Sequence, residues 1–202
     1  MKIICIGRNY AEHAKEMKSE LPKEPVFFFK PDVAILRGNR FYIPEFSNEI
    51  HYEVELVVKI NKVGKYIDEK FAHTYYNEIG LGIDFTARDI QRECKAKGLP
   101  WEKAKAFENS AVLSKEFIPK SELDLNNINF SLQLNQETVQ QGNSSQMIFT
   151  IDQIIAYISK FVTLKIGDLI YTGTPSGVGA VNIGDKLDGY IGEQKMFNIE
   201  IR

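Results

Sequence analysis

The stretch at residues 51–58 (His-Tyr-Glu-Val-Glu-Leu-Val-Val) constrains the fold of this 202-residue chain more than any other segment. Its β-branched and apolar residues predict a β-strand. Side chains of a strand alternate between two faces, so His51, Glu53 and Glu55 are expected on one face and the apolar residues between them on the other. The chain must therefore bury one face of this strand and accommodate neighbouring carboxylates on the other.

Two carboxylates placed in this way need a proton, a basic partner or a cation between them. The Cβ atoms of Glu53 and Glu55 would lie about 7 Å apart. At about 5 Å and an effective dielectric constant near 20, two such charges repel by roughly 3 kcal/mol. One acid could take up a proton, a Lys or Arg could lie between them, or a divalent cation could bind both. A solvated strand face with two surface acids is the plain alternative.

The composition is that of an ordinary globular domain, with 44% hydrophobic and 26% charged residues. The net charge of -2 gives no reason to expect a nucleic acid or an anionic membrane as a partner. Cys5 and Cys94 match no disulfide or zinc spacing, which favours a reducing compartment. The sequence contains no apolar run of 18 residues and no recognisable signal or transit segment, so we expect a cytoplasmic protein.

Short strands along the whole chain, with two or three helices between them, predict a β-rich α+β fold in a single domain, residues 1–202. Strands are expected at residues 2–6, 26–30, 40–43, 51–58, 79–85, 128–134, 169–172, 186–191 and 195–201. We expect the strand at residues 26–30 to be buried, and Gln136-Glu137 to form the turn of a hairpin. The glycines within residues 79–85 indicate a close approach of neighbouring backbone.

Helices are expected at residues 86–97 and 151–161, and residues 11–20 are expected to form a short, mostly polar helix or a mobile cap. Thr86 with Asp89, and Thr150 with Gln153, match capping boxes at two of the helix starts. The apolar residues of the third helix recur at helical spacing and are expected in the core: Ile151, Ile154, Ile155, Ile158 and Phe161. Residues 101–107 are expected to form a loop that carries Lys103 and Lys105.

Common catalytic motifs are missing from the sequence. The loop at residues 173–179 has no G-K-[ST] and no G-x-G-x-x-G pattern, so a turn that offers backbone N–H groups and the hydroxyl of Thr174 to an anion is favoured over a nucleotide site. His13, His51 and His73 have no zinc-ligand spacing, and no G-x-S-x-G occurs. Carboxylate ligands would instead suit Mg²⁺ or Mn²⁺.

A second polar pair is formed by His13 and Glu16, which are neighbours on one face of the first expected helix. Such a pair could be a general base with its orienting carboxylate, or an ordinary surface pair. Lys105, taken alone, is of a type that is usually solvated. The residues therefore support a possible metal site and do not name a reaction.

Taken together, these segments resemble the fumarylacetoacetate hydrolase superfamily, and specifically its small acylpyruvase/oxaloacetate decarboxylase branch. The matching segments appear in family order over nearly the whole chain: Gly7-Arg8-Asn9-Tyr10 with His13, Phe29-Lys30-Pro31, His51-Tyr52-Glu53-Val54-Glu55-Leu56, Asp84-Phe85-Thr86-Ala87-Arg88-Asp89 with Gln91, Lys97-Gly98-Leu99-Pro100-Trp101 with Lys105, and Thr172-Gly173-Thr174-Pro175-Ser176-Gly177-Val178-Gly179. The resemblance implies a mixed β-roll of the family's C-terminal domain type, usually in a homodimer.

The resemblance also implies roles for particular residues. It makes the metal ligands Glu53, Glu55 and Asp84, with Mg²⁺ or Mn²⁺ as the cofactor. It makes His13 and Glu16 a catalytic pair on a mobile lid, residues 11–22, and it places Lys105 facing the reacting carbonyl. It assigns to the surroundings of a small 2-oxo acid substrate the residues Arg88, Gln91 and Thr174.

The implied chemistry is Mg²⁺-dependent hydrolysis of acylpyruvates to a carboxylate and pyruvate. We favour hydrolysis because His13, Glu16 and Lys105 are all present. Decarboxylation or tautomerisation of oxaloacetate, and isomerisation or decarboxylation of 2-oxo-dienoates, are alternatives on the same metal site.

Overall fold

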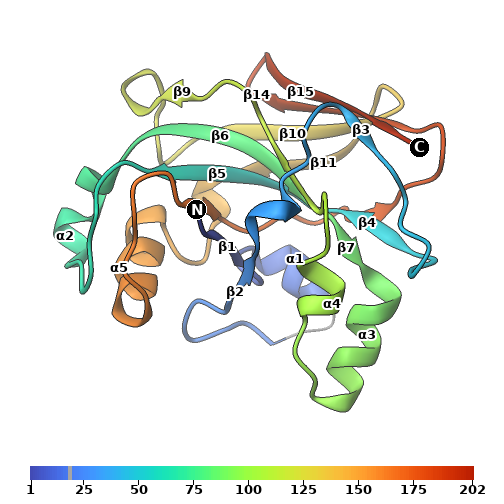
Figure 1. Ribbon diagram of the computed structural model, residues 1–202. Coiled ribbons are helices and arrows are strands. Elements are labelled where there is room, and N and C mark those ends of the chain that lie inside the picture. Colours follow the sequence, from blue (N-terminus) through green and yellow to red (C-terminus); the bar gives the residue numbers. More distant parts are fainter. Residues whose placement is uncertain (18–19) are drawn as a thin grey trace.

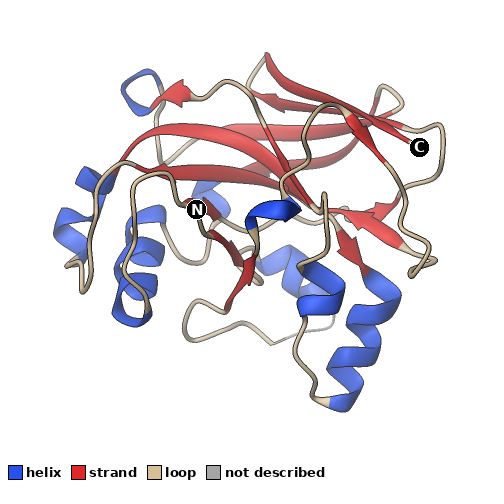
Figure 2. Ribbon diagram, viewed as in Figure 1, coloured by secondary structure: helices blue, strands red, loops and turns tan. Residues whose placement is uncertain are grey.

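The computed structural model describes residues 1–17 and 20–202 (Figure 1). Its strands form three sheets of seven, five and three strands, and the helices lie mainly along one side of them (Figure 2). Strands predominate over helices, which confirms the predicted β-rich α+β class.

The seven-stranded sheet has the order β2-β1-β12-β5-β6-β8, and β9 pairs with β6. Its strands are β1 (Ile3–Ile6), β2 (Phe27–Lys30), β5 (Val54–Ile60), β6 (Tyr76–Asp84), β8 (Ala111–Leu113), β9 (Ile118–Pro119) and β12 (Leu169–Tyr171). The five-stranded sheet, in the order β11-β10-β14-β15-β3, contains β3 (Arg40–Phe41), β10 (Asn129–Leu134), β11 (Glu137–Asn143), β14 (Lys186–Ile191) and β15 (Gln194–Ile201). The three-stranded sheet, in the order β13-β4-β7, contains β4 (Ile50–Tyr52), β7 (Thr86–Ala87) and β13 (Gly179–Ala180).

The α-helices are α1 (Ala11–Glu16), α2 (Glu69–Ala72), α3 (Arg88–Lys97), α4 (Glu102–Lys105) and α5 (Ile151–Phe161). Short 3₁₀ turns occur at Asp32–Ala34, His73–Tyr75, Lys120–Glu122 and Ser144–Gln146. In Figure 1, α2 and α5 lie together at one end of the molecule, and α1, α3 and α4 lie together near the other end. Within residues 1–17 and 20–202, no helix is long and apolar enough to cross a membrane.

The main hydrophobic core lies between the five-stranded sheet and one face of β5 and β6. On β5, Val54, Leu56 and Val58 point into this core, whereas Val57 belongs to a smaller core shared with β1 and β12. The two faces follow from the two-residue period of a strand. Glu55 has the same parity as Val57, so its carboxylate lies on the side of the smaller core.

The segment predicted as one strand over residues 51–58 is two strands, with Glu53 between β4 and β5. β4 pairs with β7 and β13, whereas β5 pairs with β6 and β12. The chain therefore passes from one sheet to another at Glu53, and the prediction of a continuous strand was wrong.

The two predicted capping boxes have different outcomes. The box formed by Thr150 and Gln153 at the start of α5 is confirmed. The box formed by Thr86 and Asp89 was wrong, because α3 begins at Arg88 without a side-chain cap. The carboxylate of Asp89 instead accepts hydrogen bonds from the preceding chain, at Ser47 Oγ (2.6 Å) and Asn48 N (2.9 Å).

Several boundaries also differ from the predictions. α4 lies inside the expected loop at residues 101–107, and the hairpin turn is at Asn135 and Gln136, which have φ values of 52° and 74°. The isoleucines of α5 are buried as predicted, but Phe161 is 55% exposed. β2 is the edge strand of its sheet and is not fully buried, since Phe29 is 39% exposed. The expected helix over residues 11–20 ends at Glu16, and residues 18–19 of that helix and of the expected lid lie outside the described residues.

The predicted close approach at the glycines of β6 is confirmed, and it generates a prediction for stability. A Cβ added at Gly82 would lie 2.5 Å from Tyr171 Cε1 and 2.5 Å from the carbonyl oxygen of Val112. We expect Gly82→Ala to lower the free energy of unfolding by about 1–3 kcal/mol, because a packed backbone and ring must move. Chemical denaturation measures this loss. Gly7→Ala is the matched control, since its Cβ would come no closer than 3.4 Å to another residue; equal losses in the two variants would contradict the packing argument.

Candidate metal centre and active site

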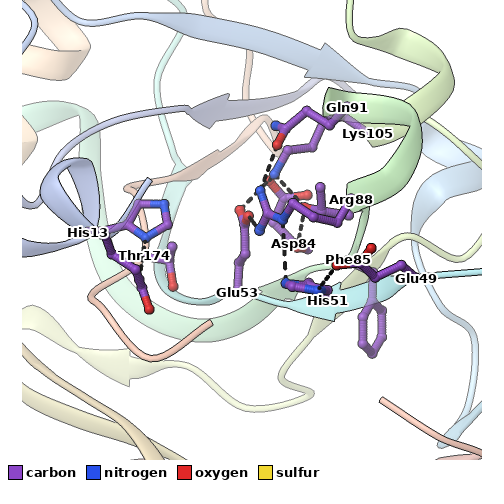
Figure 3. A network of polar contacts seen from close by, with 12 residues as sticks. His13, Glu49, His51, Glu53, Asp84, Phe85, Arg88, Gln91, Lys105 and Thr174 are labelled. Atoms are coloured by element: carbon purple, nitrogen blue, oxygen red, sulfur yellow. Dashed lines mark hydrogen bonds and ion pairs between the residues drawn. The ribbon is translucent and has the colours of Figure 1, made fainter. Parts of the chain in front are cut away.

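Three buried carboxylates meet where β5 and β6 run side by side. Glu53 lies at the break before β5, Glu55 lies on β5, and Asp84 is the last residue of β6. One oxygen from each carboxylate lies within 4.8 Å of the others. Figure 3 shows Glu53 and Asp84 at the centre of a network of polar contacts.

The register of the two strands explains this meeting. Glu55 pairs with Gly82, and side chains of directly paired residues share a face of the sheet. Asp84 is two residues beyond Gly82 and Glu53 is two residues before Glu55, so all three acids are directed to the same side. The backbone N–H of Asp84 donates to the carbonyl oxygen of Glu53 (2.8 Å), which joins the two strand ends.

Lys105 at the end of α4 compensates two of the acids. Its Nζ donates to Glu53 Oε2 (2.7 Å), Asp84 Oδ2 (2.7 Å) and Thr86 Oγ1 (2.6 Å). Burial alone would lower the pKa of Lys105, but the charges of Asp84 and Glu53 outweigh it and raise that pKa above its usual value. In Glu53, likewise, burial would raise the pKa, yet Lys105 and Arg88 lower it far below its usual value. This pair is therefore charged at neutral pH.

Lys30 is a second buried cation, and the sequence analysis gave it no role. Its Nζ lies 2.7 Å from Asp84 Oδ1, and it also donates to Ser110 Oγ (2.9 Å) and to the carbonyl oxygen of Lys105. Lys30 thus connects β2 to both Asp84 and the end of α4. Its position at the end of an apolar strand, directly before a proline, was the signal that could have indicated a buried lysine.

The negative charge of Glu55 is the least compensated of the three, and its surroundings therefore show whether a metal ion would fit. Its Oε2 accepts a hydrogen bond from the backbone N–H of Gly173 (2.7 Å), and no basic side chain of residues 1–17 or 20–202 forms an ion pair with it. Burial, together with the charges of Asp84 and Glu53, raises the pKa of Glu55 well above its usual value. A divalent cation would remove this repulsion, and three carboxylate oxygens are a donor set suited to Mg²⁺ or Mn²⁺. The residues present therefore fit such an ion.

Arg88 and Gln91, on the first turn of α3, form the next part of the network. The guanidinium group of Arg88 donates to Glu53 Oε1, to Gln91 Oε1 (2.6 Å) and, through Nε, to His51 Nδ1 (3.4 Å). His51 Nε2 in turn contacts Glu49 Oε1 (2.9 Å). Because Arg88 donates to Nδ1, the proton of a neutral His51 is on Nε2. His51 therefore orients Arg88, although it shares a strand segment with the acids.

The histidine of the expected catalytic pair is buried and faces the same pocket. His13 and Glu16 lie on α1, and His13 Nδ1 is 3.2 Å from Glu16 Oε2. If Nδ1–H donates to this carboxylate, Nε2 is the acceptor that a general base requires. Burial lowers the pKa of His13 below 6.5, although the charges of Glu53 and Glu16 act in the opposite direction. His13 is thus neutral at pH 7. One pocket is lined by residues that include His13, Glu53, Arg88, Gln91 and Lys105.

Thr174, which is labelled in Figure 3, accepts a hydrogen bond from a glutamine to which the sequence pattern gave no role. Gln140 on β11 is 1% exposed, and its Oε1 accepts from the backbone N–H of Val54 (2.9 Å). Its Nε2 donates to Thr174 Oγ1 (2.8 Å) and to the carbonyl oxygen of Pro175 (3.0 Å). Because the Thr174 oxygen already accepts this bond, its O–H is directed elsewhere as a donor. Gln140 thereby ties the loop at residues 173–179 to the strand that carries Glu55.

The chain is similar to several known proteins over nearly its whole length. The chain matches the family model described as fumarylacetoacetate (FAA) hydrolase C-terminal over residues 2–200. It is 46% identical over 191 residues to the mitochondrial oxaloacetate tautomerase FAHD1 of Rattus norvegicus, covering 94% of this chain and 86% of that protein. It is 47% identical over 189 residues to the mitochondrial oxaloacetate decarboxylase of Dictyostelium discoideum, covering 92% and 86%.

Among solved structures, the fumarylpyruvate hydrolase of Pseudomonas aeruginosa in complex with Mn²⁺ and pyruvate superposes with a TM-score of 0.93. It is 35% identical, and the match covers 100% of this chain and 89% of that one. The mixed β-roll expected from the resemblance is therefore confirmed.

The acid cluster generates a prediction for metal binding. We expect Glu55→Gln to weaken Mg²⁺ or Mn²⁺ binding by at least about tenfold, since the loss of even an outer partner of a metal site typically costs roughly 10- to 100-fold. Isothermal titration calorimetry measures the affinity. Glu78→Gln is the matched control, because Glu78 lies on the same strand as Asp84 but pairs with Lys59 at the surface. Unchanged affinity in Glu55→Gln would contradict the assignment of this ligand.

Proposed function

The chain belongs to the fumarylacetoacetate hydrolase family, and from this premise we propose that it is a divalent-metal-dependent enzyme that acts on small 2-oxo acids. One observation carries the proposal: a neutral buried histidine on α1 lines the same pocket as Glu53 of the three-carboxylate cluster. A base next to a cation site is the arrangement needed to move a proton at the carbon beside a 2-oxo group, or at an attacking water.

We propose the metal ligands to be Glu53, Glu55 and Asp84, with Mg²⁺ as the cofactor and Mn²⁺ as its alternative. Hard carboxylate oxygens favour both ions, and the Pseudomonas fumarylpyruvate hydrolase that resembles this chain binds Mn²⁺. When bound, such an ion supplies Lewis-acid stabilisation of the negative charge that develops as an enolate forms.

The residues of the chain would do the rest. His13 removes the proton and Glu16 holds its imidazole in the required tautomer. Arg88, Gln91 and the O–H of Thr174 are donors that can bind the substrate carboxylate. Because the three N–H groups of Lys105 contact Glu53, Asp84 and Thr86, its positive charge would stabilise through space the oxyanion that forms when a carbonyl is attacked.

Oxaloacetate tautomerisation is the first candidate reaction, because the 46%-identical rat protein is an oxaloacetate tautomerase. His13 would remove a proton from C3 of the keto form, or return one to the enol. Acylpyruvate hydrolysis, which the sequence analysis favoured, is the second candidate. The pairing of His13 with Glu16 supports it, because the pair can deprotonate a water, and so does the resemblance to a fumarylpyruvate hydrolase. Decarboxylation of oxaloacetate requires no such water.

We expect wild-type protein with Mg²⁺ to accelerate the keto–enol exchange of oxaloacetate, followed by enol absorbance, and to release pyruvate from acetylpyruvate. We expect EDTA to abolish both activities. His13→Ala should reduce both by roughly 10²- to 10⁴-fold, because each needs a base, and should affect oxaloacetate decarboxylation far less.

The exposed histidine His73 provides the control His73→Ala, which should retain full activity. Undiminished activity in EDTA would contradict the proposal that the enzyme depends on a metal ion. A loss of decarboxylation as large as the loss of hydrolysis in His13→Ala would contradict the role of His13 as a base.

The pH dependence of kcat/KM provides a further prediction. The active form of His13 is the neutral imidazole, so activity should fall as pH drops through its pKa, which burial holds below 6.5. The carboxylate of Glu16 raises that pKa. Glu16→Gln should therefore shift the acid limb of the pH profile to lower pH while reducing the plateau rate. A shift of the limb to higher pH would contradict the pairing.

A further inference from the structure

The active-site pocket contains two cations that neither the acid cluster nor the proposed reaction uses. Arg8 lies two residues after the end of β1, and Lys95 lies on α3; both line the pocket together with Arg88, Gln91 and Trp101. The space between the atoms that line the pocket, with its open mouth included, is about 350 Å³.

The placement of Lys95 follows from helix geometry. Residues three and seven positions after Arg88 recur on the same face of α3, so Arg88, Gln91 and Lys95 form one row along the pocket. Helical side chains point back toward the N-terminus, which directs Lys95 toward Gln91 and the metal centre. The ammonium group of Lys95 also lies 5.5 Å from the centre of the Trp101 ring, so this ring forms part of the same wall.

The cations that line or adjoin the pocket differ in whether a carboxylate neutralises them. Lys105, Arg88 and Lys30 each contact a carboxylate of the acid cluster. Within the described part of the chain, by contrast, neither Arg8 nor Lys95 forms a salt bridge with any acid. The Lys95 side chain is exposed to solvent overall, but partial desolvation and the guanidinium groups of Arg88 and Arg8 lower its pKa to about 8, so it is still mainly protonated at pH 7.

We propose that Arg8 and Lys95 bind a second carboxylate at the far end of the substrate, and that the enzyme therefore selects dianionic 2-oxo acids over monoanionic ones. This inference rests on the proposed function, because it assumes that the first carboxylate and the 2-oxo group are held at the metal centre. A monoanionic 2-oxo acid would leave both cations without a counter-charge in the pocket, whereas a 2-oxo dicarboxylate supplies one.

The test compares two acids of equal length that differ only at the far end. 2-Oxoglutarate ends in a carboxylate and 2-oxopentanoate ends in a methyl group. At C4, neither acid has the carboxylate or carbonyl group that decarboxylation or hydrolysis requires, and proton exchange at C3 returns the same acid. Isothermal titration calorimetry in the presence of Mg²⁺ therefore reads binding alone. We expect wild-type protein to bind 2-oxoglutarate at least about tenfold more tightly, since hydrogen bonds between charged groups are among the strong ones.

Lys95→Gln and Arg8→Gln should each reduce this preference by at least about tenfold, chiefly by weakening 2-oxoglutarate. Lys95→Arg should retain most of it, which separates loss of charge from loss of folding. Lys97→Gln is the matched control on the same helix, because Lys97 is exposed and pairs with Glu93. Its preference should equal that of the wild type.

Equal binding of the two acids by the wild type, no binding of 2-oxoglutarate, or an unchanged preference in both glutamine variants would overturn the inference. Turnover of oxaloacetate by wild-type protein, measured in parallel, separates this result from the proposed function. Turnover without a charge preference removes the inference alone. A charge preference without turnover of any 2-oxo acid removes the proposed reaction and leaves the dianion site standing.

Discussion

Repulsion among three buried carboxylates is the constraint on which the rest of the site depends. Two unit charges about 5 Å apart repel by roughly 3 kcal/mol at an effective dielectric constant near 20, and a third acid adds to this. The chain offsets the repulsion with Lys105 and Lys30, two buried lysines from separate elements, and with Arg88. Breaking one such buried pair costs several kcal/mol, so these cations also tie β2, α3 and α4 to the strand ends that carry the acids. Glu55 keeps no such partner, which leaves the cluster suited to one more cation.

The fold gathers these charges with two local devices. The first is the transfer of the chain between sheets at Glu53, which ends the ladder of β4 and begins that of β5. The second is the glycine opposite Glu55, which leaves room for the ring of Tyr171 and for the backbone of the next strand. A buried glutamine, Gln140, then bridges the start of β5 and the loop at residues 173–179. The change of sheet at Glu53, the small volume of the glycine opposite Glu55 and the side-chain amide of Gln140 thus position site groups that are far apart in the sequence.

The sequence predicted what depends on local periodicity and missed what depends on contacts between distant segments. The common face of Glu53 and Glu55 follows from the two-residue period of a strand. This period continues when the chain passes from one sheet to another, so it could not reveal the break between β4 and β5. The meeting of His13 with Glu16 follows from helical spacing. Gln140 gave no signal, because β11 is polar along most of its length and the partner of this side chain is the backbone of Val54, 86 positions away. The roles of the metal ligands came from family resemblance, and the dimer expected from it stays a prediction.

One metal centre can serve tautomerisation, decarboxylation and hydrolysis, because all three pass through a similar enolate. The acid cluster therefore sets the common step, and its geometry alone does not choose among substrates. Selection among substrates must come from groups that contact the part of the substrate away from the acid cluster. The side chains that line the pocket there lie on α1, on the face of α3 that carries Arg88, and just after β1. In the proposed function, His13 on α1 is the base that would remove a proton from carbon or from water, and by the inference above Arg8 and Lys95 would set the charge that the far end of the substrate must carry. On these two proposals the reaction and the substrate class would depend on different residues, so each could change while the acid cluster is retained.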